Sequence, residues 1–277
     1  MLLGLDTYSH HLAFGRHPDF HPRKPMDLFA FIEKVSEYGL NGFQIDPMHL
    51  GATDDEYLTT VREEAESRGF FLEYGIMSTR AGDIRKGIHL CEKLGSTILR
   101  TFIGFNRYDP KTRVSEELDF ARKEIASCLP DLERSGVRLA VENHGDVRSD
   151  ELVRLVEEID SPHVGICLDV GNSLCVLEEP LAAAKRMIPF AFTVHFKDYT
   201  IQCTPSGSKI TGVPLGEGVL PLSGLYRLID EEGMLDRLIL EIPLEPGHGE
   251  KHSLEREEEA IRRSVAFCKE NLFVGNP

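Results

Sequence analysis

The sequence lacks the features that mark membrane-spanning and secreted proteins. It contains no run of about 20 apolar residues, the length that a membrane-spanning helix requires. Its six cysteines form no Cys-x-x-Cys pair and no pattern of a disulfide-stabilised secreted domain. Residues 1–6 contain no basic residue and reach an aspartate too early for a signal peptide. We therefore expect a cytoplasmic protein with reduced thiols and no membrane association.

The sequence also lacks an excess of basic residues. It has 31 lysines and arginines against 46 aspartates and glutamates, which gives a formal net charge of −15. No cluster of lysine and arginine interrupts this acidic composition, and an acidic surface repels phosphate backbones. The charge balance therefore argues against nucleic acid as a partner. The hydrophobic content of 41% is ordinary for a globular protein.

Short apolar runs alternate with longer amphipathic stretches along the chain. Eight runs rich in Val, Ile, Leu and Phe predict strands at residues 2–9, 42–47, 70–76, 97–102, 137–144, 164–170, 192–197 and 238–243. The stretches that follow them predict helices at residues 25–38, 54–67, 84–94, 116–135, 149–159, 181–187, 222–232 and 255–271. Glycines at helix ends agree with this division, namely Gly39, Gly69, Gly95, Gly136 and Gly233.

Repeated strand–helix units predict a parallel sheet with right-handed crossovers. Eight units in 277 residues favour closure into one (β/α)8 TIM barrel domain over residues 1–277. The alternative is an open, doubly wound sheet. Its usual nucleotide-binding fingerprint, Gly-x-Gly-x-x-Gly, does not follow the first predicted strand. We therefore prefer the barrel.

The longest irregular region is predicted at residues 201–218, which are rich in glycine and proline. This region follows the seventh predicted strand, on the face where barrels of this type carry their active sites. It is predicted to be either a mobile lid or a plain surface loop.

Four residues of metal-ligating types occur near the ends of the last four predicted strands: Glu142, Asp169, His195 and Glu241. Charged residues inside apolar runs are costly to bury unless they are compensated. Because the C-terminal ends of barrel strands converge, we expect these side chains to meet at the barrel mouth. There, one divalent ion is the simplest way to offset three carboxylates.

The ligand types limit which metal suits such a centre. Oxygen and imidazole ligands suit Mn²⁺, Mg²⁺, Co²⁺ or Zn²⁺, and Mn²⁺ is the preferred expectation. No cysteine is among the four ligands, so the sequence predicts no thiolate centre. A metal ion can act as a Lewis acid on an enediolate, and a nearby carboxylate can move the proton next to a carbonyl.

Four segments carry a resemblance to a known family: residues 141–144, 168–172, 195–198 and 240–242. They resemble, in order and spacing, the metal motifs of the xylose-isomerase-like superfamily of sugar isomerases, epimerases and cyclitol dehydratases. The likeness covers nearly the whole chain. It implies that Glu142 and Glu241 bind the metal and also act as an acid/base pair on opposite sides of the substrate. Asp169 and His195 would then be pure ligands.

One position departs from part of this superfamily. Ketohexose 3-epimerases typically carry a histidine three residues after the metal-binding aspartate, where this sequence has Asn172. Dehydratases often show a His-x-Lys-Asp stretch like residues 195–198. The resemblance therefore implies a metal-dependent isomerase or epimerase acting on a ketose or related sugar-like carbonyl compound. A lyase that dehydrates a keto-cyclitol or decarboxylates a keto-acid sugar is the alternative.

Other polar residues lie near the predicted strand ends. His144 and Lys197 flank the ligands and are candidates for polarising a carbonyl or donating a proton. Candidates for substrate contact are His10, His11, Asp46 and Arg100.

Two other function classes are alternatives to a sugar enzyme. An apurinic-site endonuclease shares the barrel but needs a basic groove and many histidine ligands, which the net charge of −15 and the single histidine on a ligand strand oppose. A non-catalytic binding protein does not explain four clustered ligands. We expect a small-molecule partner and leave a homo-oligomer open.

Overall fold

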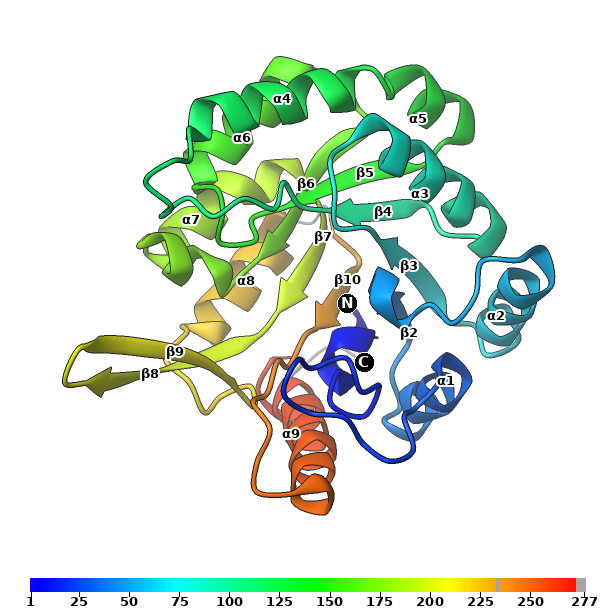
Figure 1. Cartoon of the computed structure of the whole chain (residues 1–277), viewed down its shortest axis with the longest axis vertical. Coiled ribbons are helices and arrows are strands. Elements are labelled where there is room, and N and C mark those ends of the chain that lie inside the picture. Colours follow the sequence, from blue (N-terminus) through cyan, green and yellow to red (C-terminus); the bar gives the residue numbers. More distant parts are fainter. Residues whose placement is uncertain (233–234, 273–277) are drawn as a thin grey trace.

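The computed structural model describes residues 1–232 and 235–272. Its centre is a closed barrel of parallel strands in the order β1-β10-β7-β6-β5-β4-β3-β2 (Figure 1). The barrel strands are β1 (Leu2–Asp6), β2 (Gly42–Ile45), β3 (Phe71–Gly75), β4 (Ile98–Thr101), β5 (Arg138–Glu142), β6 (Val164–Asp169), β7 (Ala191–Phe196) and β10 (Arg237–Leu240). The predicted (β/α)8 barrel is confirmed.

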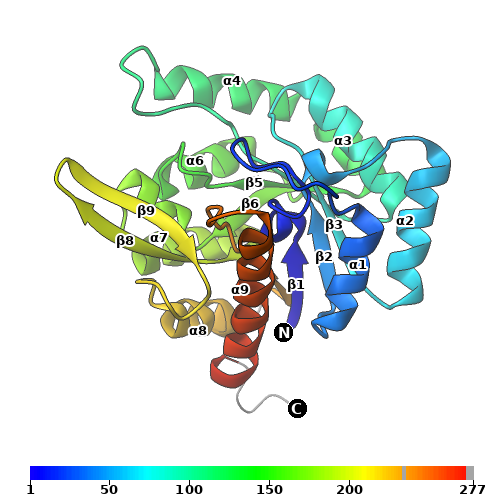
Figure 2. The ribbon, with the colours of Figure 1, turned by 60° about the horizontal axis from the view of Figure 1, so that its bottom comes forward.

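Helices surround the barrel on its outside, as Figures 1 and 2 show. They are α1 (Leu28–Glu37), α2 (Asp55–Ser67), α3 (Ala81–Leu94), α4 (Val114–Ala126), α5 (Leu129–Ser135), α6 (Ser149–Ile159), α7 (Pro180–Met187), α8 (Leu222–Glu232) and α9 (Glu250–Asn271). Short 3-10 helices η1 (Thr7–His10), η2 (Pro47–His49), η3 (Asn172–Val176) and η4 (Ile188–Phe190) complete the set. Among the described helices, none combines the length and apolar character needed to cross a bilayer.

Successive side chains along each strand point to opposite faces of the sheet, and this separates apolar from polar side chains. Leu3 and Leu5 of β1 and Phe43 and Ile45 of β2 belong to the large buried core that includes the helices. The residues between them point to the other face of the sheet, which is the barrel interior. That interior holds Asp6 and other polar side chains at the C-terminal ends of the strands, and this arrangement positions the site.

The opposite end of the barrel interior is filled by an aromatic ring. A Cβ atom on Gly4 would lie 2.5 Å from the ring of Phe71, and one on Gly42 would lie 2.4 Å from the Phe71 carbonyl oxygen. Glycine is therefore required at both positions by close approach. The Arg237 guanidinium lies 4.6 Å from the centre of the same ring. This end is closed, so the interior can open only at the C-terminal ends of the strands.

One predicted helix is divided in the structure. The single helix predicted at 116–135 is broken into α4 and α5, because Pro130 has no backbone N–H and its ring clashes with the preceding helical turn. Helix ends at Gly95 and Gly136 are confirmed, with left-handed φ angles of 72° and 71°. Gly39 and Gly69 also adopt positive φ. The predicted helix end at Gly233 lies outside the described residues.

The prediction of irregular structure at residues 201–218 is wrong for most of that range. Strands β8 (Asp198–Thr204) and β9 (Gly207–Val213) pair as an antiparallel hairpin that projects from the barrel (Figures 1 and 2). The pair Thr204↔Gly207 closes a two-residue turn, and Ile201 pairs with Ile210. Strand-favouring Thr and Ile residues outweigh the glycines, which lie at the turn and near the hairpin base. Whether this region acts as a lid stays a prediction.

Candidate metal centre

The four predicted ligands lie together at the C-terminal ends of neighbouring strands. Glu142 ends β5, Asp169 ends β6, His195 lies in β7, and Glu241 directly follows β10. One potential ligand atom from each lies within 4.8 Å of those from the other three. Glu142, Asp169 and His195 are at most 1% exposed, and Glu241 is 9% exposed. The structure therefore brings the four predicted ligands together.

The imidazole of His195 presents Nδ1 to the carboxylates. Nδ1 lies 2.8 Å from Glu241 Oε2, 3.7 Å from Glu142 Oε1 and 3.8 Å from Asp169 Oδ2. On its other side, Nε2 lies 2.8 Å from Gln44 Oε1. The amide nitrogen of Gln44 donates to Glu73 Oε2 at 2.9 Å, so its oxygen must face His195. Nε2 therefore carries a proton, and Nδ1 faces the carboxylates.

These residues fit a divalent cation. His195 Nδ1, Glu142 Oε2 and Asp169 Oδ2 are buried atoms without an aligned hydrogen-bond partner among the described residues. Three carboxylates around one point repel one another unless a positive charge lies between them. Three oxygen ligands and one imidazole are a donor set that divalent metals accept.

Lys197 supplies a second positive charge beside the ligands. Its Nζ lies 2.7 Å from Asp169 Oδ2 and 2.8 Å from Glu241 Oε1, and the residue is 2% exposed. Burial alone would lower the pKa of Lys197, but the two carboxylates outweigh burial and raise this pKa well above its usual value. Lys197 is therefore charged at neutral pH.

Arg100 occupies the other side of the cluster. Its Nη2 donates to Asp46 Oδ2 at 3.1 Å, and its Nε donates to Gln44 Oε1 at 3.2 Å. The same Nε lies 3.5 Å from Glu142 Oε2. Arg100 is 4% exposed, so its charge acts in a poorly hydrated environment where electrostatic interactions are strong.

Four acidic groups near the centre have shifted pKa values. Burial would raise the pKa of Glu142, but His195, His144 and Arg100 lower it to about 2. Burial would also raise the pKa of Glu241, but Lys197 and His195 lower this pKa well below its usual value. In contrast, burial dominates at Asp6 and raises its pKa to about 7, despite the opposing charges of His195 and Arg100. Glu142 and Glu241 are thus stabilised as anions, whereas at the third ligand, Asp169, burial outweighs Lys197 and raises the pKa.

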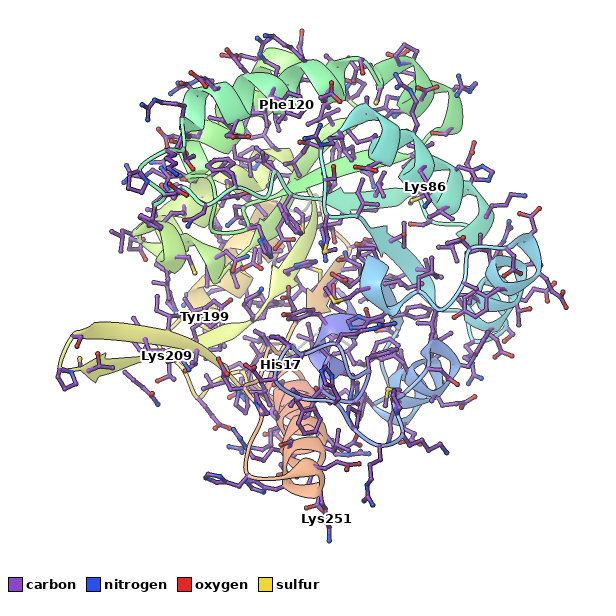
Figure 3. All side chains as sticks on the ribbon, in the orientation of Figure 1. His17, Lys86, Phe120, Tyr199, Lys209 and Lys251 are labelled. Carbon is purple, nitrogen blue, oxygen red and sulfur yellow. The ribbon has the colours of Figure 1, made fainter. Side chains whose placement is uncertain are left out.

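A cavity of about 300 Å³ opens above the four ligands. Its walls are formed by Tyr8, Asp46, Met48, Met77, Arg100, Phe102, Glu142, His144, Asn172, Lys197, Tyr199, Glu241 and Pro243. Figure 3 shows Tyr199 where the hairpin β8–β9 leaves the barrel. The cavity has the size of a small-molecule site and combines polar groups with aromatic walls.

Several predicted site residues reach this cavity. His144 stacks on Phe102 with ring centroids 4.0 Å apart and planes 11° apart, which fixes its ring on the cavity wall. Asp46, Arg100 and Lys197 also line the cavity. The structure thus places four of the six additional candidates at the barrel mouth.

The two N-terminal histidines point elsewhere. His10 Nε2 lies 3.0 Å from the Tyr38 hydroxyl, and Nδ1 lies 3.4 Å from Glu257 on α9. The ring of His11 stacks on Tyr8 at 4.7 Å, and its Nδ1 lies 2.9 Å from the Tyr8 carbonyl oxygen. The cause is the 3-10 helix η1, which turns the chain after Asp6 where the sequence predicted a continued strand. Tyr8 reaches the cavity instead.

Several supporting contacts were not predicted from the sequence pattern. The acids Asp6 and Glu73 lie in the barrel interior, and Thr193 donates to Glu73 Oε2 at 2.9 Å. Asn172 donates through its side chain to Glu142 Oε1 at 3.1 Å. In the sequence, these residues could have been found only as polar residues at inward-facing strand positions, the same feature that identified the ligands.

One cysteine lies close to the predicted ligands. Cys167 lies two residues before Asp169 on β6 and therefore on the same inward face. Its sulfur and one ligand atom each from Glu142 and His195 lie within 4.8 Å of one another. Burial raises the pKa of Cys167 to about 12. A thiol therefore lies within reach of the metal centre.

The barrel and this cluster define the class of protein. A family model described as "Xylose isomerase-like TIM barrel" matches residues 32–271, and the chain belongs to that family. The resemblance drawn from the four sequence segments is thereby confirmed. Members of this family include sugar-processing enzymes.

Individual relatives differ in activity. A protein of Pectobacterium atrosepticum named 3-oxo-isoapionate decarboxylase is 28% identical over 232 residues, covering 83% of this chain and 81% of that protein. A crystal structure of D-psicose 3-epimerase in the presence of D-fructose superposes with a TM-score of 0.74 at 16% identity, covering 97% of this chain and 98% of the other. The IOLI protein with a binding zinc atom gives 0.73 at 14% identity, covering 96% and 97%. The structural likenesses support the fold alone.

Proposed function

We propose that this protein is a metal-dependent enzyme that uses Glu142, Asp169, His195 and Glu241 to hold one divalent cation, Mn²⁺ as first choice. It acts on a small sugar-like carbonyl compound through an enediolate. Among the reactions that share this intermediate, we infer a lyase that removes CO2 from a keto-acid sugar. When bound, the cation would supply a Lewis acid for the negative charge that develops on the substrate oxygen.

The carrying observation is the pair of buried cations on the cavity wall. Arg100 and Lys197 come from β4 and from the residue after β7, with β5 and β6 between these strands in the barrel. Both line the cavity, and both are at most 4% exposed. A substrate carboxylate fits between such groups, because a buried anion needs compensating charge. A neutral ketose does not require two cations.

The contacts of the two glutamates also favour a lyase. In an isomerase or epimerase, one carboxylate removes a proton and another returns it, so each must be free to accept one. Glu241 has Lys197 beside Oε1 and His195 beside Oε2, both at 2.8 Å. Glu142 accepts from Asn172 at Oε1. Decarboxylation needs no such base, because the electron pair comes from the breaking C–C bond.

Lys197 then serves as the proton donor. The bond to the substrate carboxylate breaks, its electron pair passes into the enediolate, and CO2 leaves. Lys197 Nζ gives a proton to the same carbon and regains one from solvent. Arg100 holds the carboxylate beforehand, and His144 is positioned by Phe102 to donate to a substrate oxygen. The relationship to a named 3-oxo-isoapionate decarboxylase supports this choice.

An isomerase or epimerase is the second candidate function. Glu142 and Glu241 come from β5 and from the end of β10, with β6 and β7 between them, so they reach the cavity from different sides. This placement matches the acid/base pair that the family resemblance implies, and the overall fold matches D-psicose 3-epimerase.

A substrate panel separates these functions. The Mn²⁺-loaded protein is incubated with 3-keto sugar acids, ketoses and inososes in deuterated water, and the products are read by mass spectrometry. We expect a keto acid to lose CO2 and the product to gain one carbon-bound deuterium. Lys197→Met should lower kcat by roughly 10²–10⁴-fold, whereas Lys209→Met on the exposed hairpin (Figure 3) should not change it. An isomer of a ketose that carries one carbon-bound deuterium, without CO2 release from any keto acid, would instead establish the isomerase.

A further inference from the structure

We propose that this metal centre has a second position, deeper in the barrel, at which a soft divalent cation such as Cd²⁺, Co²⁺ or Zn²⁺ is bound by Cys167, Glu142 and His195. The inference rests on the metal centre of the proposed function but not on its reaction. It adds a thiolate ligand to a centre for which the sequence predicted only oxygen and imidazole.

The strand register places the thiol directly below the carboxylate ligands. Asp169 is paired with His195, whereas Cys167 is paired with Thr193 on the same neighbouring strand. On its other side Cys167 is paired with Glu142. Cys167 is therefore one inward-facing position deeper than Asp169, between two strands that both carry ligands. One ligand atom from each of Cys167, Glu142 and His195 lies within 4.8 Å of the others.

Two of the three residues of this group carry buried atoms without an aligned hydrogen-bond partner in the described part of the chain. His195 Nδ1 and Glu142 Oε2 lack an aligned hydrogen-bond partner among the described residues, and both side chains are almost fully buried. The floor beneath Cys167 is apolar, formed by Ile98 and Ala140 with Phe192 against them. This floor adds no polar group that could bind these atoms from below, and a dry pocket favours thiolate coordination over hydration of the metal.

The two positions differ in what a cation must displace. At the upper position, the cation competes with Lys197 for Asp169 Oδ2, where the ion pair measures 2.7 Å. At the deeper position, the pairs from Lys197 to Asp169 and to Glu241 remain intact. A thiolate and a carboxylate balance the two charges of the metal. Soft cations prefer thiolate, and hard cations prefer carboxylate, so metal identity selects the position.

The choice of position has a functional consequence. The upper position borders the cavity lined by Glu142, Lys197 and Glu241, whereas Cys167 is fully buried and is not on its wall. A soft cation at the deeper position is withdrawn from a substrate in the cavity. Binding there releases the thiol proton to solvent as the metal–sulfur bond forms.

Thiolate coordination has a spectroscopic signature that does not depend on activity. The metal-free protein is titrated with Co²⁺ and with Cd²⁺, and the ultraviolet sulfur-to-metal charge-transfer absorption is recorded. Wild type and Cys91→Ser should show the band, because Cys91 is a buried cysteine outside the described ligand groups. Cys167→Ser should lose it and bind Cd²⁺ roughly 10–100-fold more weakly, with Mn²⁺ affinity changed less than about 3-fold.

The same titration can overturn the proposal. No band in the wild type, or a band that persists in Cys167→Ser, removes Cys167 as a ligand. Cadmium NMR of the wild type alone, in which a thiolate ligand shifts the resonance away from that of oxygen and nitrogen ligands, keeps the test valid if the variant does not fold. Mn²⁺ binding measured alongside tests the upper position, so a failure of the proposed function is seen separately.

Discussion

The two halves of the barrel contribute different things to one centre. Strands β5, β6, β7 and β10 supply or immediately precede the four candidate ligands, whereas β1 to β4 supply groups that hold those ligands. Gln44 of β2 fixes the tautomer of His195, and Arg100 of β4 lies beside Glu142. The ligand half can be recognised in the sequence because its candidate residues, Glu, Asp and His, are of metal-ligating types. The supporting half acts only through hydrogen bonds to the other half.

Breaking the ligand half should have the largest effect. Asp169→Asn keeps the size of the side chain but removes the negative charge from a fully buried ligand. We expect Mn²⁺ affinity to fall more than ~100-fold and turnover to be lost. Isothermal titration calorimetry measures the affinity, with Asp150→Asn on the exposed side of α6 as the control. Unchanged Mn²⁺ affinity in Asp169→Asn would refute the assigned ligand set.

Metal binding should stabilise the fold through the ligand half. A cation that binds only the folded state at 100 times its Kd adds about 2.7 kcal/mol to the free energy of unfolding. For a chain of this size we expect a rise in Tm of roughly 5–10 °C, reversed by a chelator and absent in Asp169→Asn. Thermal unfolding followed by circular dichroism checks this, and an equal rise in the variant would show that Mn²⁺ binds elsewhere.

Breaking the supporting half should cost less and leave the ligands in place. Gln44→Met removes the acceptor from His195 Nε2 and should lower metal affinity by roughly 10–100-fold. Thr193→Val, on β7, removes a hydrogen bond to Glu73 of the supporting half, one step further from the ligand His195, and should change affinity less than about 3-fold. Calorimetry on both variants tests the gradient. Equal losses would mean that the network acts as one unit rather than through His195.

The smallest expected effect is a pH dependence in the supporting half. His49 follows β2, its Nδ1 lies 2.9 Å from the Thr7 hydroxyl, and burial lowers its pKa to about 3. The ordinary pKa is 6.5, so below pH 6.5 the unfolded chain binds a proton that the folded chain rejects. Stability present above pH 6.5 is therefore lost as pH falls toward 3, by about 1 kcal/mol at pH 5.5.

A matched variant isolates this contribution. His49→Gln keeps an acceptor for Thr7 but does not titrate, so its stability should fall less steeply between pH 7 and 5.5 than that of the wild type. Urea unfolding of the metal-free proteins measures the difference. Parallel pH curves for the two proteins would show that His49 is not kept neutral by the fold.

The comparison of halves also explains which residues could be predicted. Glu142 and Asp169 stood out because each ends an apolar run and belongs to a type that binds metal. Glu73 and Asp6 also lie in strand-like runs, but nothing in their local sequence says which distant group they face. Glu73 meets Thr193 across 120 residues of chain. Such partners meet only when the barrel closes, so the residues next to each one in the sequence do not identify them.

The sequence by itself determined the barrel, its strand order and the four residues whose strand ends converge, because hydrophobic period and ligand chemistry are local properties. It did not determine the turn of η1 that removes His10 and His11 from the cavity, nor the hairpin β8–β9. Nor did it place Cys167 beside Glu142 and His195. These features were decided by the tertiary structure, because strand register across the closed sheet and competition among buried polar groups fix where each side chain finds its partners.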